Sequence, residues 1–118
     1  MNDEQSGEVE SVTAIEAIAA VATGDSATVL VDVREQDEWD RGHAPEAVHL
    51  PMSELEARYN ELPEDANLLI ICHSGGRSFR VTDALERAGY NAVNVEGGML
   101  AWHAAGGAVV TDARGQQG

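Results

Sequence analysis

Four short apolar runs that alternate with helix-like segments constrain the fold of this chain more than any other feature. The runs cover residues 29–33, 47–50, 68–71 and 92–95. Each has the length of a strand and is mostly bounded by turn or polar residues. The third run, LLII, is apolar at every position, which is typical of a strand covered on both faces, as in a parallel sheet. Strands that alternate with helices predict an α/β domain with a mainly parallel sheet.

The segments between the runs have the spacing of amphipathic helices. Thr13 and Glu16 form a capping-box pattern ahead of an apolar stripe, and Ser53 with Glu56 repeats that pattern. A third segment, residues 78–88, carries apolar residues at helical spacing on one face. Helices are therefore expected near residues 13–22, 53–62, 78–88 and 99–105.

The charge of the chain excludes several classes of protein. Its 118 residues include 21 acidic and 7 basic side chains, all of them arginine, which gives a net charge of −14. Such a chain is a poor candidate for binding nucleic acid or an anionic membrane surface. A single cysteine cannot form an intramolecular disulfide or a thiolate-rich zinc site. The four histidines lack metal-ligand spacing, so neither a metal nor another cofactor is expected.

The organisation of the chain indicates one domain. The hydrophobic content of 43% is enough for a core, which we place at residues 11–110. An acidic tail is expected at residues 1–10 and a second tail at 111–118. No apolar run approaches the ~20 residues that span a bilayer, and the N-terminus lacks the pattern of a secretory signal. A cytoplasmic monomer is the resulting expectation.

The segment after the third run reads C-H-S-G-G-R-S, from Cys72 to Ser78. Gly75 and Gly76 allow positive φ and a close approach of the backbone to a ligand. A tight loop ahead of a helix turns several N–H groups toward one point. These dipoles and the Arg77 guanidinium would stabilise a Cys72 thiolate and lower its pKa. A buried core cysteine is the alternative, but the loop favours an activated nucleophile.

This loop resembles the active-site loop of the rhodanese sulfurtransferase family. The same resemblance extends over residues 11–107, in the family's order, through V-D-V-R-E from Val31, G-H-A-P-E-A-V-H-L-P from Gly42 and E-G-G-M-L-A-W from Glu96. The chain departs from the family's pattern at Ala44, where isoleucine is usual, and at Glu46, where glycine is usual. Both departures concern local turn geometry. The resemblance implies a rhodanese-like fold, with a five-stranded, mostly parallel sheet flanked by helices on both sides.

The resemblance also implies a chemistry. Cys72 would attack the outer sulfur of a small anionic donor such as thiosulfate, release sulfite and hold the sulfur as a persulfide. An external nucleophile would then take it with ping-pong kinetics: cyanide in an assay, or a thiol or sulfur-carrier protein in the cell. Arg77 would orient the donor and stabilise developing negative charge. The His73 side chain is expected to point to solvent. The backbone of the loop would stabilise the persulfide through His73, Ser74, Gly75, Gly76 and Ser78.

Other residues are expected to support the loop. Asp32 lies in a buried run and should be paired, and the resemblance suggests a structural ion pair or brace that includes Arg34. His43 resembles a position that braces a turn, and Trp102 resembles a packing residue beneath the carboxyl end of the sheet. Ser78 is expected to be the N-cap of the following helix, and it is also placed to touch the persulfide.

Several alternatives to a freely turning-over sulfurtransferase remain open. The chain could serve as a persulfide relay or as a regulatory binding module with little turnover. A cysteine phosphatase or arsenate reductase is less favoured, because those loops resemble C-x5-R, whereas only four residues separate Cys72 from Arg77. The acidity of the chain fits either a saline cytoplasm or a basic acceptor protein.

Overall fold

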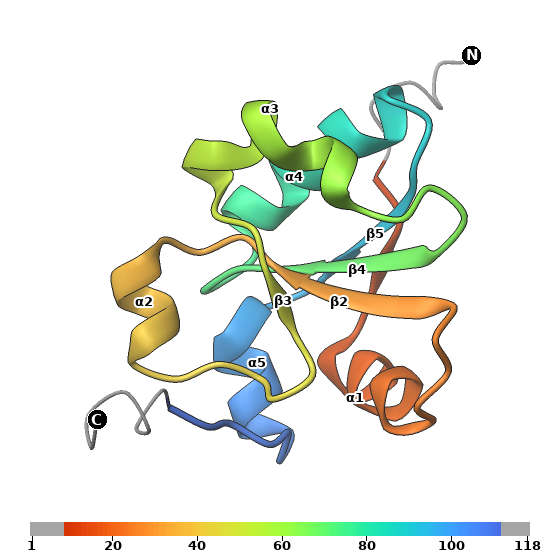
Figure 1. The fold of residues 1–118 in the computed structure, drawn as a ribbon. Helices are drawn as coiled ribbons and strands as arrows, with labels where there is room; N and C mark the ends of the chain where they lie inside the picture. The colour runs from red at the N-terminus through yellow and green to blue at the C-terminus, as the bar shows by residue number, and fades with distance from the viewer. Residues whose placement is uncertain (1–8, 112–118) are drawn as a thin grey trace.

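The computed structural model describes residues 9–111, and Figure 1 shows their arrangement. The five strands are β1 Ser11–Val12, β2 Thr28–Asp32, β3 Val48–His49, β4 Asn67–Ile71 and β5 Asn91–Val95. The five α-helices are α1 Ala14–Ala22, α2 Gln36–Asp40, α3 Leu55–Arg58, α4 Gly76–Arg87 and α5 Gly98–Ala104. Two 3-10 turns, Met52–Glu54 and Tyr59–Glu61, flank α3.

The strands form one sheet in the order β1-β5-β4-β2-β3, and all four neighbouring pairs are parallel. The predicted α/β fold with a five-stranded sheet is therefore confirmed, and the sheet is fully rather than mostly parallel. The LLII run lies in β4, the central strand, where all four side chains are buried. A parallel strand with both faces covered needs apolar residues at successive positions, which explains the run.

Helices cover both faces of the sheet. In Figure 1, α3 and α4 lie over one face, and α1 and α5 lie over the other. Each face has its own apolar cluster: one includes Leu68, Ile70 and Leu85, and the other includes Leu69 and Trp102. Alternate residues of β4 thus point into opposite clusters, which locks the register of the central strand.

Two local patterns had different outcomes. The capping box at Thr13 is confirmed, because the Thr13 hydroxyl accepts from the Glu16 N–H and the Glu16 carboxylate accepts from the Thr13 N–H. The second capping box, at Ser53, is wrong. Ser53 lies inside a 3-10 turn, and its hydroxyl donates to the Glu35 carboxylate 18 residues earlier. Tertiary contacts with the β2–α2 connection therefore override the local pattern.

The parallel arrangement brings the carboxyl ends of the strands to one edge of the sheet. Ligands of open α/β sheets bind at this edge. The segments that follow β2, β4 and β5 meet there, and they carry Arg34, Cys72 and Gly97. Residues 1–8 and 112–118, most of the two predicted tails, lie outside the described residues. In the described part of the chain no helix is long and apolar enough to cross a membrane.

Candidate active site

The loop from Cys72 to Gly75 connects the central strand to α4. Gly75 is the N-cap of the helix and has a φ of 115°, a conformation that side-chain-bearing residues rarely adopt. Gly76 is already helical and has no positive φ, so only one of the two glycines is needed for the turn. The prediction that Ser78 is the N-cap is wrong. Ser78 lies in the first turn of α4, and its hydroxyl oxygen is 3.2 Å from the Gly75 carbonyl.

Cys72 is 1% exposed and has two close polar neighbours. The Gly75 N–H donates to Sγ at 3.1 Å, and the Ser78 hydroxyl lies 3.3 Å from Sγ. Burial by itself raises the pKa of the thiol. Hydrogen bonds from the Ser78 side chain and from the N–H groups of Ser78, Gly75 and Ser74 outweigh that effect and lower the pKa below its usual 9.0. The loop thus favours a thiolate at a buried position.

The start of α5 holds the Cys72 loop from the other side. The Met99 N–H donates to the Cys72 carbonyl at 2.7 Å, and the Leu100 N–H donates to the His73 carbonyl at 3.1 Å. Gly98 makes this approach possible, because a Cβ at that position would lie 2.4 Å from the Cys72 oxygen. The Gly97–Gly98 pair, the two glycines of the E-G-G-M segment, therefore supports the loop through backbone contact rather than through a side chain.

Arg77 is held by a carboxylate that the sequence interpretation missed. Its two terminal nitrogens donate to the Glu38 carboxylate at 2.7 and 2.8 Å, in a bidentate ion pair between α4 and α2. This hydrogen-bonded pairing lowers the pKa of Glu38 to about 2 and raises that of Arg77. Two of the five N–H donors of the guanidinium are used in the pair, so others remain for a ligand.

The residues predicted to support the loop have partners of their own near the carboxyl edge of the sheet. The Arg34 guanidinium bonds the buried Asp32 carboxylate and also donates to the Gly42 carbonyl at 2.7 Å. The His43 ring stacks on Trp39 with a centroid distance of 3.5 Å, and its Nδ1 lies 2.9 Å from the Trp39 carbonyl. These contacts tie the segments after β2 and α2 together.

Two further aromatic side chains also have defined partners. His49 stacks on the same indole, Trp39, and its Nε2 lies 2.8 Å from the Arg34 carbonyl. Trp102 is buried, and its Nε1 donates to the Ala108 carbonyl. The side chain of His73, by contrast, lies at the surface.

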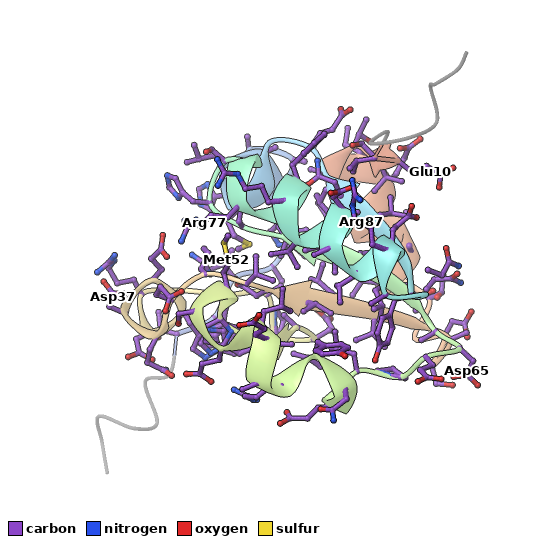
Figure 2. All side chains as sticks on the ribbon, turned by 90° about the horizontal axis from the view of Figure 1, so that it is seen from above. Glu10, Asp37, Met52, Asp65, Arg77 and Arg87 are labelled. Atoms are coloured by element: carbon purple, nitrogen blue, oxygen red, sulfur yellow. The ribbon has the colours of Figure 1, made fainter. Side chains whose placement is uncertain are left out.

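A cavity of about 410 Å³ adjoins the loop. It is lined by Arg34, Glu38, Arg41, Gly42, His73, Met99, Leu100, His103 and Val109. Two arginines therefore face one carboxylate, and that carboxylate is already paired with Arg77. Figure 2 shows the labelled side chains Arg77, Met52 and Asp37 toward this end of the molecule, whereas Asp65, just before β4, lies toward the opposite end. Within the described residues no cluster of three or more histidine, cysteine, aspartate or glutamate side chains could hold a metal ion.

Comparison with known proteins decides the family. The Rhodanese-like domain family matches residues 13–105, which is most of the chain. The chain belongs to the rhodanese-like family. A solved rhodanese-related protein from Thermoplasma volcanium superposes with a TM-score of 0.78 at 32% identity, over 86% of this chain and 97% of that protein. The rhodanese-like fold thus accounts for nearly the whole of that relative.

Two relatives from Bacillus subtilis have names that refer to sulfur. YtwF, provisionally named a sulfurtransferase, is 42% identical over 78 residues, which cover 66% of this chain and 76% of YtwF. YrkF, provisionally named a sulfur carrier protein, is 39% identical over 89 residues, which cover 75% of this chain and 48% of YrkF. This rhodanese-like chain therefore spans about half the length of YrkF and about three quarters of YtwF.

Proposed function

We propose that this protein is a sulfurtransferase that carries a sulfane sulfur atom on Cys72. The single observation that carries the proposal is the environment of Sγ: a buried thiol that receives a 3.1 Å hydrogen bond from the Gly75 N–H and has a lowered pKa, at the carboxyl end of the central strand. Membership of the rhodanese-like family and the names of YtwF and YrkF support the same chemistry.

The first half-reaction loads the enzyme. The Cys72 thiolate attacks the outer sulfur of thiosulfate, a new Sγ–S bond forms, and the S–S bond of the donor breaks with its electron pair leaving on sulfite. One negative charge then rests on the terminal sulfur of the persulfide. The N–H groups of Ser74, Gly75 and Ser78 already lower the thiol pKa by favouring negative charge at Sγ, and in the proposed reaction the same N–H groups stabilise the charge of the persulfide.

The donor is a small anion and needs a path to the loop. The cavity beside His73 is lined by Arg34 and Arg41, and its one carboxylate, Glu38, is paired with Arg77. Arg34 is buried and bonds Asp32, so the exposed Arg41 is the more accessible of the two arginines for an incoming anion. We place the anion on this side of the loop, where the unused N–H groups of Arg77 can also orient it. Attack by cyanide or a thiol on the terminal sulfur returns the Cys72 thiolate. The two half-reactions give ping-pong kinetics.

A sulfur relay is the second candidate. The name of YrkF favours it, because a carrier holds the persulfide until a partner protein takes the sulfur. The chemistry at Cys72 is the same in both cases. The two candidates differ in the second half-reaction, since a relay transfers slowly to cyanide and rapidly to its partner protein.

Mass spectrometry after incubation with thiosulfate tests the proposal. We expect a gain of one sulfur atom on Cys72 in the wild-type protein, reversal by cyanide with release of thiocyanate, and no gain in Cys72→Ser. The Cys72→Ser variant replaces the thiol with a hydroxyl of similar size, so it separates loss of the nucleophile from loss of the fold. Absence of any mass gain with thiosulfate and with a thiol persulfide donor would overturn the sulfurtransferase function.

A further inference from the structure

A chain of polar side chains leads from the nucleophile through the buried Ser78 and Asn94 to Ser11 on the edge strand β1. The Ser78 hydroxyl lies 3.3 Å from Cys72 Sγ and 2.6 Å from Asn94 Oδ1. Asn94 Nδ2 in turn lies 3.3 Å from the hydroxyl of Ser11, which faces it across the β1–β5 pair. Ser78 and Asn94 are both buried, so these groups depend on one another for hydrogen bonds.

The number of hydrogen atoms fixes the direction of these bonds when the thiol is protonated. Ser78 has one hydroxyl hydrogen, and the shortest of its contacts is the one to Asn94 Oδ1. Ser78 therefore donates to Asn94 and accepts from the Cys72 S–H. The Asn94 amide then donates from Nδ2 to the Ser11 oxygen. In this state every group has a partner.

Ionisation of Cys72 reverses the direction of the hydrogen bond between Cys72 and Ser78. A thiolate can only accept, so Ser78 must turn its hydrogen toward Sγ, and the Ser78 oxygen is left facing Asn94. An amide can satisfy this oxygen by rotating so that Nδ2 points to Ser78. Oδ1 then faces Ser11, whose exposed hydroxyl can rotate to donate. A side chain with both a donor and an acceptor completes both states, and asparagine is such a side chain.

We infer that Asn94 is a positioning residue for the Cys72 nucleophile: its amide reverses with the ionisation of the thiol and thereby directs the single hydrogen of Ser78 toward the thiolate. The inference rests on the proposed function only in taking Cys72 as the nucleophile. Asn94 does not touch Sγ in any of the contacts described, and it acts through Ser78.

The charged groups around Cys72 come from other elements. Arg77 of α4 is near enough to interact electrostatically with Cys72, and it is paired with Glu38 of α2 and lies near Glu35. His73 follows Cys72 in the loop. In the described part of the chain none of these side chains forms a hydrogen bond or ion pair with Asn94, so a substitution at Asn94 tests the hydrogen-bonded chain rather than the surrounding charges.

The decisive measurement is the pH dependence of the Cys72 thiolate. Because the chain has one cysteine, thiolate absorbance and alkylation by iodoacetamide report on Cys72 alone, with Cys72→Ser as the blank. In Asn94→Ala the protonated state keeps an acceptor for Ser78, the Gly75 carbonyl at 3.2 Å, but the thiolate state loses the amide donor. We therefore expect the thiolate fraction at neutral pH to fall about three- to tenfold.

A double-mutant cycle separates positioning from a structural role. In the Ser78→Ala background, Asn94→Ala should cause little further change in the thiolate fraction, because the two residues act in series. Asn91→Ala is the matched control: it lies on the same strand, its amide contacts Asn67 at the surface, and it should leave the thiolate fraction unchanged. A merely structural role for Asn94 would lower the melting temperature of Asn94→Ala and leave the pKa of the thiol unaltered, which would overturn the inference.

A nearly isosteric variant keeps the test decisive if Asn94→Ala does not fold. The carboxylate of Asn94→Asp can only accept hydrogen bonds, so it keeps the Ser78 hydroxyl hydrogen pointing toward itself and away from the thiolate. The thiolate fraction should then fall more than about tenfold, whereas the surface variant Asn91→Asp should change it little. In the wild type, the side-chain NH2 signals of Asn94 should shift with the pH at which Cys72 titrates. Normal persulfide formation with an unchanged thiol pKa in the Asn94 variants would refute the positioning role and leave the proposed function standing. A changed thiol pKa in the Asn94 variants, together with no persulfide on the wild-type protein, would support the positioning role and refute the proposed function.

Discussion

Glu38→Gln is the most informative perturbation of the candidate site outside the nucleophile itself. The Glu38 carboxylate accepts two hydrogen bonds from Arg77, at 2.7 and 2.8 Å, and so fixes the guanidinium beside the loop. The amide of glutamine can keep one acceptor but presents an NH2 group to the second nitrogen. The variant therefore loses the charge and half of the bidentate geometry while the length of the side chain is preserved.

The size of the effect follows from the pKa of Glu38. Its bonds with Arg77 lower this pKa from 4.5 to about 2, which at about 1.4 kcal/mol for each pH unit sets a ceiling of roughly 3 kcal/mol. The Arg77 side chain is 34% exposed and that of Glu38 is 22% exposed, so solvent screens the pair. We expect Glu38→Gln to reduce the free energy of unfolding by about 1–2 kcal/mol at pH 7.

The stabilisation by the Glu38–Arg77 pair should decrease as the pH falls. A carboxylate with a lowered pKa in the folded state contributes stability that is fully present above the unfolded-state value of 4.5 and is lost as the pH falls toward about 2. Urea denaturation of the wild type and Glu38→Gln should therefore show a difference at pH 7 that shrinks to less than about half by pH 3.

Glu54→Gln supplies the matched control for this comparison. Glu54 bonds Arg58 within one exposed helical turn, and Arg58 also pairs with Glu61, so the control should change the free energy of unfolding much less than Glu38→Gln does. A Glu38→Gln effect that equals the control, or one that is the same at pH 3 and pH 7, would refute the reasoning.

Three further predictions test other parts of the site. Gly98→Ala should destabilise the protein by roughly 2–5 kcal/mol, because the added Cβ would meet the Cys72 carbonyl in a backbone with positive φ. Gly76→Ala is the control, because nothing lies within 4 Å of the added Cβ, and its free energy of unfolding should stay within about 1 kcal/mol of the wild-type value. Thermal denaturation of both variants measures the difference. Arg41 lines the cavity, and Arg41→Gln should raise the KM for thiosulfate about two- to fivefold at low salt. Arg87 is equally exposed, at 70%, but lies outside the cavity lining, so Arg87→Gln should leave the KM unchanged. Equal effects of the two substitutions would exclude the cavity as the donor's path. Because the folded state lowers the pKa of the thiol below 9.0, the stability of the wild type relative to Cys72→Ser should increase as the pH rises toward 9, and a flat difference in urea denaturation would contradict the lowered pKa.

The fold could be predicted from the sequence where local pattern and tertiary environment agree. The LLII run shows on its own that β4 is covered on both faces, and the Thr13 capping box marks the start of α1. The position of Cys72 followed from the same logic, since the residue after a central parallel strand must lie at the carboxyl edge of the sheet. These inferences need no information about distant parts of the chain.

The remainder depends on contacts between residues far apart in the sequence. Glu38 and Arg77 are separated by 39 positions, and α2 spans only five residues, too few to show a helical period. The one usable signal was the pair Glu35 and Glu38, three residues apart directly after a strand, which forms a capping box in the structure. Ser78 was assigned as the N-cap because serine is a favoured residue there, but the positive φ of Gly75 starts the helix three residues earlier.

The anionic donor and the charge of −14 can be reconciled by distance. Repulsion from the many surface carboxylates acts over the Debye length, about 10 Å in 0.1 M salt, and weakens as salt is added. The attraction at the loop acts at hydrogen-bond distances in a site where Cys72 is 1% exposed, and buried groups are screened far less. Glu38 adds little repulsion at this site, because its pairing with Arg77 neutralises a carboxylate that would otherwise face the cavity. The ion pair therefore neutralises the acidic residue beside the loop, and in the proposed reaction it would also hold the unused N–H groups of Arg77 toward the incoming anion.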